Sequence, residues 1–192
     1  MVGIQKWVSK LLKKPFSKSN RKQQKSLTSS ETTSTPEPQV SAKAAMIEEW
    51  MKAWQRHDFE KITAMSSEQC EYHVPLDDGE VMQVTLRDFL EQMGLVYLSF
   101  PDYESSWDSI EDGKEENLVV IKGFVSTGTH TGEPFAFGPF PALPGKGVKI
   151  KDDPINLVVT IKEGKIDILR PMVAGGQIGP ASYYTQIGGV II

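Results

Sequence analysis

The spacing of apolar residues predicts helices in the first half of the chain. Between residues 41 and 57 the apolar side chains recur every three or four positions, which places them on one face of a helix. That face carries Ala44, Ile47, Trp50, Met51 and Trp54. Ser41 can cap this helix, and Asp58 can cap a short second one. A third helical face follows Thr85 and should end before Pro101, because proline disfavours helical backbone in the residue before it.

In the second half of the chain the pattern changes to one that is typical of strands. The segment from Leu118 to Ser126 is apolar on both faces, which predicts a strand in the middle of a sheet. Two further strands are expected at Val148–Ile161 and Ile166–Val173, joined by a hairpin turn. Helices followed by mostly antiparallel strands predict an α+β fold with the helices packed on one side of a curved sheet. Such a sheet closed by helices leaves a cavity, and cavities of this kind hold ligands.

A long loop rich in glycine, proline and phenylalanine is expected at residues 128–147. It carries five glycines and four prolines around Phe135, Phe137 and Phe140. A long aromatic loop in a small domain favours a functional lid over an idle connection. The alternative is a loop that folds its own phenylalanines down as a plug.

The first 40 residues differ in composition from the rest and are interpreted as a basic, disordered tail and linker. Residues 1–30 hold eight Lys/Arg and no acid, and residues 26–40 are rich in Ser, Thr and Pro. Within the tail, residues 2–16 place apolar side chains at helical spacing among lysines. That pattern suits contact with an anionic membrane surface, a partner's groove or an organelle transit peptide, and a disordered extension is the alternative. The domain is therefore expected at residues 41–192.

The charge and cysteine content narrow the classes of partner and compartment. Residues 41–192 hold thirteen Lys/Arg against twenty-three Asp/Glu, a balance of −10, which argues against nucleic acid as a partner. The one cysteine, Cys70, permits no intramolecular disulfide and suits a reducing compartment. No apolar run approaches the ~20 residues that span a bilayer. These features predict an intracellular protein, either cytoplasmic or targeted to an organelle by its basic N-terminus.

Three side chains are candidates for acid–base or anion-stabilising chemistry. His130 lies at the mouth of the long loop and could shuttle a proton, or it could hydrogen-bond the turn as a structural residue. His73 alternates with Glu71 and could be a pocket base or an edge-strand histidine in water. Arg170 is in phase with the apolar positions of the last strand, so it needs a substrate anion or an internal acid as its partner.

Other polar residues predict no site. The histidines and Cys70 are scattered and form no zinc pattern, so no metal is expected. Neither a dinucleotide-binding nor a P-loop signature opens a helix, and no nucleophile elbow is present. The acids Asp77, Asp78, Asp152 and Asp153 stand beside Gly or Pro, and turn chemistry explains them without a catalytic role.

Four short segments stand out by their order and spacing: Phe100–Tyr103, GTHTG at 128–132, GKGV at 145–148 and EGKI at 163–166. Together they resemble the SnoaL-like group, which includes the polyketide cyclases and belongs to the nuclear-transport-factor-2-like superfamily, and the similarity covers about residues 44–188. The resemblance implies a cone-shaped α+β barrel whose mouth accepts a small apolar molecule. It also implies chemistry without a metal or organic cofactor, with proton transfer by an Asp and a His.

The sequence departs from the family pattern after the GKI hairpin. Members similar to the cyclases usually carry Glu-His-Trp there and an Asp a few residues further on, whereas residues 167–176 read DILRPMVAGG. Arg170 takes roughly the place of the aromatic residue, and the downstream acid is absent. The family's acid–base aspartate is therefore not carried over to this chain.

Three hypotheses follow. The first is a cofactor-independent enzyme for cyclisation, isomerisation or hydration, with His130, His73 and Arg170 as its reacting groups. Its pocket would be lined by Trp50, Trp54, Tyr97, Trp107 and Phe137. The second is a non-catalytic member that binds a small molecule or pairs with another chain, including a second copy, through its sheet, and is targeted by its basic N-terminal segment. The third places the function in the tail, with the body as a dimerising or adaptor module.

Overall fold

The computed structural model describes residues 41–75, 81–173 and 178–191. The sequence-based assignments to the tail and to Asp77 and Asp78 lie outside these residues. So do residues 174–176, at the end of the DILRPMVAGG segment. The helices are α2 (Ala42–Gln55), α3 (Phe59–Met65), α4 (Leu86–Ser99) and α5 (Pro180–Gln186). The strands are β1 (Ser66–Pro75), β2 (Val81–Thr85), β3 (Glu104–Ser106), β4 (Ser109–Asp112), β5 (Leu118–His130), β6 (Val148–Lys151), β7 (Ile155–Lys162) and β8 (Lys165–Met172).

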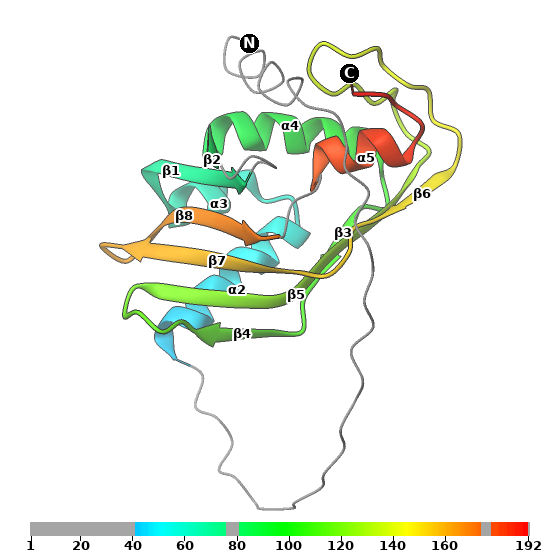
Figure 1. The fold of residues 1–192 in the computed structure, drawn as a ribbon. Helices are drawn as coiled ribbons and strands as arrows, with labels where there is room; N and C mark the ends of the chain where they lie inside the picture. The colour runs from blue at the N-terminus through cyan, green and yellow to red at the C-terminus, as the bar shows by residue number, and fades with distance from the viewer. Residues whose placement is uncertain (1–40, 76–80, 174–177, 192) are drawn as a thin grey trace, which may run out of the picture.

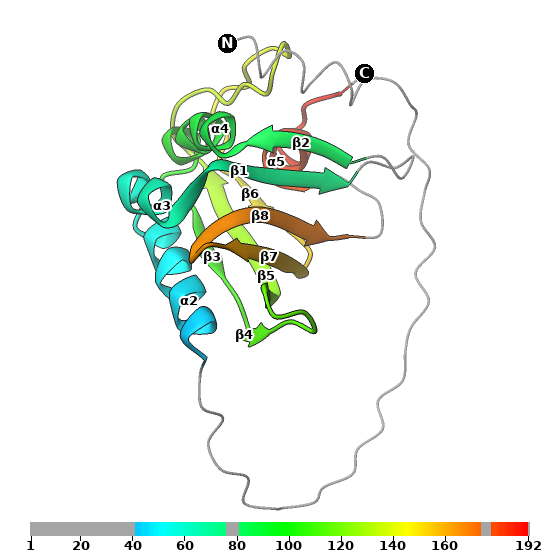
Figure 2. The same ribbon diagram turned by 90° about the vertical axis from the view of Figure 1, so that its left-hand side faces the viewer.

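The strands form one strongly curled mixed sheet, an open half-barrel, so the expected α+β class is confirmed (Figure 1). Its order is β2-β1-β8-β7-β5-β3, with β4 and β6 also pairing with β5. The pairing of β1 with β8 is parallel, and the other pairings are antiparallel. Figure 2 shows α2 and α3 on one side of this curved sheet and α4 across its top edge.

The curl depends on an irregularity in the longest strand. The first half of β5 pairs with β4 and β7, whereas its second half pairs with β3 and β6. Between the halves the register with β7 shifts, and Gly123 adopts φ +62°. The left-handed backbone at Gly123 favours glycine, and a Cβ there would also displace the Asp108 carboxylate. The bulge bends the strand and lets one strand serve both walls of the half-barrel.

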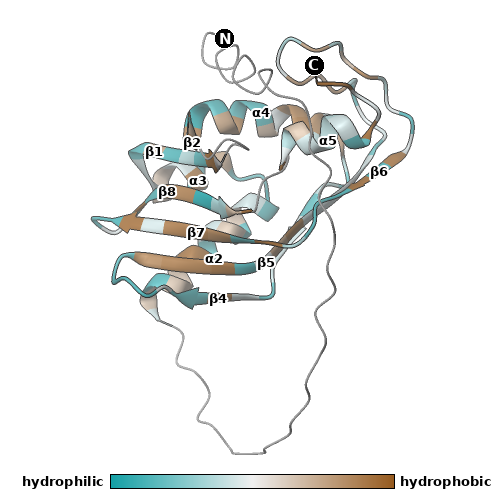
Figure 3. Ribbon diagram, in the orientation of Figure 1, coloured by the Kyte–Doolittle hydropathy of each residue, from teal (hydrophilic) through white to brown (hydrophobic). Residues whose placement is uncertain are grey.

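The predicted helix starts are confirmed by their capping hydrogen bonds. The side chain of Ser41 accepts from the backbone N–H of Ala44 at 3.1 Å, and Thr85 accepts from Asp88 at the same distance. Asp58 accepts from the N–H of Lys61 at 3.0 Å. The predicted apolar face of α2 is also the buried one. In Figure 3 the hydrophobic colour concentrates on β5 and β7, and residues of both strands pack with α2 in the first core.

The long loop folds over a second core rather than standing free. Phe135 and Phe137 are both 0 % exposed and pack with residues of α4 and α5. The backbone of Phe135 exchanges hydrogen bonds with that of Leu143, which closes the loop on itself. The plug is therefore the arrangement found.

Two elements differ from the sequence-based expectation. The strand expected at Val148–Ile161 is broken into β6 and β7, because residues 152–154 leave the sheet at Pro154, which has no N–H for a ladder. The helix α5 was not predicted, although Pro180 in its first turn is a recognisable start signal. Within the described residues, no helix is long and apolar enough to cross a membrane.

Candidate functional site

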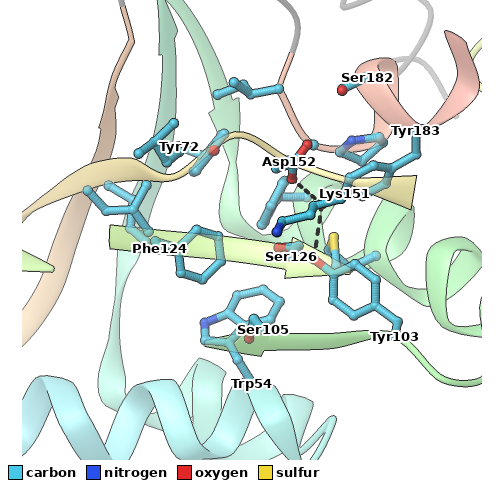
Figure 4. A pocket seen from close by; sticks show the side chains of 18 of the residues that line it. Trp54, Tyr72, Tyr103, Ser105, Phe124, Ser126, Lys151, Asp152, Ser182 and Tyr183 are labelled. Atoms are coloured by element: carbon cyan, nitrogen blue, oxygen red, sulfur yellow. Dashed lines mark hydrogen bonds between the residues drawn. The ribbon is translucent and has the colours of Figure 1, made fainter. Parts of the chain in front are cut away.

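A cavity of about 360 Å³ lies between the concave face of the sheet and the helices α2, α4 and α5. Of the residues expected to line it, Trp50, Trp54 and Tyr97 do so. The other aromatic side chains in its wall come from strands and helices far apart in the sequence: Tyr72, Phe89, Tyr103, Phe124 and Tyr183 (Figure 4). A wall of this composition favours a ring-containing or otherwise apolar ligand.

One partly buried carboxyl group enters this largely apolar space. Asp152 lies at the break between β6 and β7, and its Oδ2 accepts a hydrogen bond from the Tyr183 hydroxyl at 2.8 Å. Burial raises the pKa of Asp152 to about 6, although hydrogen bonds from Tyr183 and Ser182 oppose the shift. Asp152 therefore changes its charge near neutral pH, which is the property of a general acid or base.

Hydroxyl groups continue from Asp152 along the cavity wall. The Tyr183 and Tyr103 hydroxyl oxygens are 3.1 Å apart, and the Tyr103 hydroxyl donates to Ser126 Oγ at 2.9 Å. Figure 4 shows these side chains converging from β5, α5 and the segment before β3. Burial raises the pKa of Tyr103 to about 12 and that of Tyr183 well above its usual range. Both phenols therefore keep their protons at neutral pH.

Backbone pairing fixes the position of this group. β6 runs antiparallel to the second half of β5, with Thr127 opposite Lys151. The N–H of Asp152 donates to the carbonyl of Ser126 at 3.0 Å, so the two residues are held side by side. The chain then turns at Pro154. Lys151, Asp152 and Asp153 all border the cavity, but Lys151 and Asp153 are exposed whereas Asp152 is partly buried.

His130 has a structural setting outside the cavity. It is 1 % exposed, and its ring stacks on Phe100 with centroids 5.0 Å apart. Its Nε2 lies 3.3 Å from the carbonyl oxygen of Glu133 in the same turn. Because it does not line the cavity, the turn-bonding interpretation of His130 fits the structure, and the proton-shuttle interpretation does not.

His73 also lies away from the cavity. Its Nε2 is 2.7 Å from Glu71 Oε2, so the two side chains share a face of β1 as the alternation predicted. That face is opposite to the one that carries Tyr72, which lines the cavity. The proposed role of His73 as a pocket base has no support from this geometry.

The placement of Arg170 among inward residues is wrong. Its side chain is exposed on β8, whereas Leu169 beside it is buried and lines the cavity. The cause is a bulge: Ile161 and Thr160 of β7 face Ile166 and Ile168, which leaves an extra residue in β8. An extra residue reverses the phase of the alternation after it, so Arg170 points outward.

Trp107 and Phe137 were expected in the cavity wall, and the structure places both elsewhere. Trp107 is partly buried and packs against the first core, and Phe137 belongs wholly to the second. Neither side chain lines the cavity. Aromatic residues in an amphipathic pattern can fill either a core or a pocket, and the sequence does not separate the two cases.

Asp152 is the residue that sequence reasoning missed, because turn chemistry accounted for it. A signal was available. Asp152 interrupts a run of strand-forming residues directly before a proline, and such interruptions expose a side chain at the end of a strand instead of continuing the alternation.

A second hollow, of about 590 Å³, lies between α3, α4 and the start of β1. Its charged residues, such as Glu68, Arg87 and Lys165, are exposed, and burial raises the pKa of the Cys70 thiol in its wall to about 11. A thiol with that pKa is a poor nucleophile. In the described ranges no three acids, histidines or cysteines are grouped to hold a metal ion. The chemistry is therefore concentrated at Asp152.

Comparison with known proteins agrees with this architecture. AclR, a candidate hydroxylase from Streptomyces galilaeus, has a TM-score of 0.55 at 21% identity over 78% of this chain and 83% of AclR. IdmH, a candidate polyketide cyclase from Streptomyces antibioticus, has a TM-score of 0.53 at 16% identity over 77% of this chain and 99% of IdmH. These structures share the fold of this chain.

Sequence comparison gives the family. No curated protein matches the chain. The family model described as the SnoaL-like domain matches residues 47–167, which is more than half of the sequence. The half-barrel, the aromatic cavity and this match agree with one another, and the protein belongs to the SnoaL-like domain family.

Proposed function

We propose that the protein binds a small, largely apolar molecule in the aromatic cavity and exchanges a proton with it through Asp152. The observation that carries this proposal is a carboxyl group with a pKa of about 6 in a cavity lined mainly by aromatic and aliphatic side chains. Such a group can take a proton from a carbon acid, or return one, at neutral pH. The corresponding reaction class is a cofactor-independent isomerisation or cyclisation.

Asp152 is well placed for this task. Tyr183 holds one carboxylate oxygen at 2.8 Å and so fixes the orientation of the group. A carboxylate surrounded by apolar side chains is also a stronger base than one in water, because ionisation is the state that burial disfavours. The proposal thus assigns the acid–base role to Asp152, at the break between β6 and β7, and no longer to His130, His73 and Arg170.

Two further observations support the proposal without deciding it. IdmH, which shares the fold, is a candidate polyketide cyclase, so the half-barrel is compatible with ring-closing chemistry. The cavity volume of about 360 Å³ is also within the range of small-molecule sites.

A non-catalytic binding protein is the second candidate. The observation in its favour is the sequence after the GKI hairpin, where the acid of the cyclase-like members is absent. In that case Asp152 would recognise a donor group of the ligand. Pairing of two copies through the outer face of the sheet, and contact of residues 2–16 with a membrane, stay predictions.

The test compares binding with proton exchange. Native mass spectrometry of the intact chain purified from its own cells reveals a retained ligand. An aromatic methyl ketone such as acetophenone then serves as the probe, and NMR in D₂O follows deuterium incorporation at its methyl group. We expect catalysed exchange that Asp152→Asn lowers at least about a hundredfold, with binding retained.

Asp153→Asn is the matched control, since it removes the adjacent, exposed carboxylate. It should leave the exchange rate within about twofold, as an exposed charge acts weakly through water. Binding without any catalysed exchange would favour the non-catalytic candidate. Equal exchange in wild type and Asp152→Asn would overturn the assignment of Asp152.

A further inference from the structure

The hydroxyl groups beside Asp152 form a chain of hydrogen-bond contacts with a definite number of protons. Asp152, Tyr183, Tyr103 and Ser126 supply four oxygens joined by three contacts of 2.8, 3.1 and 2.9 Å. Ser126 is 0 % exposed and Tyr183 is 2 % exposed, so these groups must satisfy one another or a ligand. Each hydroxyl has a single proton to donate.

The proton count makes the direction of the chain depend on the charge of Asp152. If Tyr183 donates to Asp152 while Tyr103 donates to Ser126, no proton lies between the two tyrosine oxygens at 3.1 Å. All three contacts are filled in two arrangements. With Asp152 ionised, Ser126 donates to Tyr103, Tyr103 to Tyr183, and Tyr183 to the carboxylate.

With Asp152 protonated, every bond reverses. The carboxyl proton goes to Tyr183, Tyr183 donates to Tyr103, and Tyr103 donates to Ser126, which is the direction found for that last bond. The proton of Ser126 is then no longer given to Tyr103, and Tyr183, the other hydroxyl that interacts with Ser126, already accepts the carboxyl proton of Asp152. Because Ser126 lines the cavity, this proton is available to a ligand.

We propose that the chain Asp152–Tyr183–Tyr103–Ser126 is a reversible switch. When Asp152 is ionised, the Ser126 hydroxyl donates to Tyr103, and when Asp152 is protonated, it donates a hydrogen bond to a ligand oxygen instead. The ligand class is a small apolar molecule that carries a carbonyl group near Ser126. This inference rests on the proposed function, because it assigns Asp152 the proton exchange. It adds Ser126 as a catalytic residue and Tyr103 and Tyr183 as positioning residues.

In the proposed reaction the two ends act together. Asp152 takes a proton from the carbon next to the carbonyl, the electron pair of that C–H bond forms a C=C bond, and the π pair of the C=O bond moves onto the oxygen. Asp152 becomes neutral, the chain reverses, and the Ser126 hydroxyl donates to the oxygen that has just gained charge. The backbone bond of 3.0 Å between Asp152 and Ser126 holds both ends at one substrate. Stabilisation thus appears in the transition state and not before it.

The tyrosines packed around Asp152 stay protonated, so Asp152 is the group whose change of charge operates the switch. Tyr183 faces Asp152 from α5, and Tyr103 faces it from the segment before β3. Tyr72, on β1, interacts with Asp152 electrostatically. Burial keeps the pKa of each of these phenols raised, so they stay protonated. Lys151 and Asp153, on either side of Asp152 in the chain, are exposed to solvent, where their charges are screened.

The test uses two probes of the same shape, acetophenone and α-methylstyrene, which differ by a C=O in place of C=CH₂. Equilibrium dialysis gives the affinity of each at about pH 5 and about pH 8, on either side of the Asp152 pKa of about 6. In the wild type the preference for acetophenone should rise about fivefold to tenfold at the lower pH, the worth of one net hydrogen bond. The preference should not depend on pH in Ser126→Ala or in Tyr103→Phe.

The two variants report different parts of the chain. Ser126→Ala removes the donor, so the preference should stay low at both pH values. Tyr103→Phe cuts the chain and frees the Ser126 proton, so the preference should stay high at both. Binding of α-methylstyrene verifies that each variant keeps its cavity.

The opposing results separate the two proposals. If Ser126→Ala and Tyr103→Phe keep the wild-type pH dependence, the carbonyl binds Asp152 directly and the switch is wrong. If acetophenone gains nothing at low pH in the wild type, the switch is also wrong, while the proposed function stands on its own exchange assay. If neither probe binds at either pH, the cavity assignment fails and both proposals fall.

Discussion

Replacing Asp152 with asparagine should make the protein more stable at neutral pH, although it removes the proposed reacting group. Asparagine keeps an acceptor for Tyr183 but cannot ionise. In the wild type, burial raises the pKa of Asp152 from 3.8 to about 6, so ionising it in the fold costs free energy that the unfolded chain does not pay. The variant avoids this cost.

The size and sign of the effect follow from proton linkage. A pKa rise of about two units corresponds to about 3 kcal/mol at about 1.36 kcal/mol per unit. Between about pH 4 and about pH 6 the folded protein binds more protons than the unfolded chain, so wild-type stability falls as the pH rises through this window. Above it the full cost is present, and below about pH 4 it disappears.

Urea denaturation across this window measures the effect. At about pH 8 we expect Asp152→Asn to be up to about 3 kcal/mol more stable than the wild type, and the difference should shrink towards zero by about pH 4. Asp153→Asn, which alters an exposed carboxylate, should show no comparable trend. An Asp152→Asn protein that is less stable at about pH 8, or a difference that does not change with pH, would refute the reasoning.

Three further perturbations test the site and the fold. Tyr183→Phe removes a hydrogen bond to an ionised carboxylate, worth about 1.5–3 kcal/mol, and should raise the midpoint of the pH–exchange profile by about one to two pH units. Tyr184→Phe, whose hydroxyl bonds a loop carbonyl, is its control and should leave the midpoint in place. Gly123→Ala should cost about 2 kcal/mol or more in urea denaturation, because its φ is +62° and its Cβ would clash. Gly94→Ala, in a helix with open space around it, should be neutral or stabilising by up to about 1 kcal/mol. Arg170→Ala should leave probe affinity and exchange within about twofold, and a larger loss would return this exposed residue to the site.

Much of the architecture could be predicted because it is set by local chemistry. The caps at Ser41, Asp58 and Thr85 are short-range hydrogen bonds, and the buried face of α2 follows from a spacing of three and four residues. The same spacing placed Trp50 and Trp54 correctly in the cavity wall. Local patterns of this kind depend on neighbours in the sequence, which the sequence displays.

The errors arose where an extra or missing residue changes the phase of a strand. Arg170 was assigned inward by counting alternate positions, and a single bulge in β8 reversed the count. The way two strands pair decides where a bulge forms, so the alternation within one strand does not reveal it. Phe137 was expected in the pocket but lies in the second core, because the long loop packs on α4 and α5. Only the tertiary structure shows this packing.

The sequence alone therefore determined the helices α2, α3 and α4, the fold class and the family resemblance, since these depend on patterns that run along the chain. The tertiary structure decided the chemistry. Asp152 is a turn acid in the sequence, and it becomes a group with a pKa of about 6 because folding buries its carboxyl group, while a hydrogen bond from Tyr183, 31 positions away, opposes part of this shift. Desolvation and hydrogen bonding from distant segments set the proton affinity of a side chain, and neither is visible until the chain has folded.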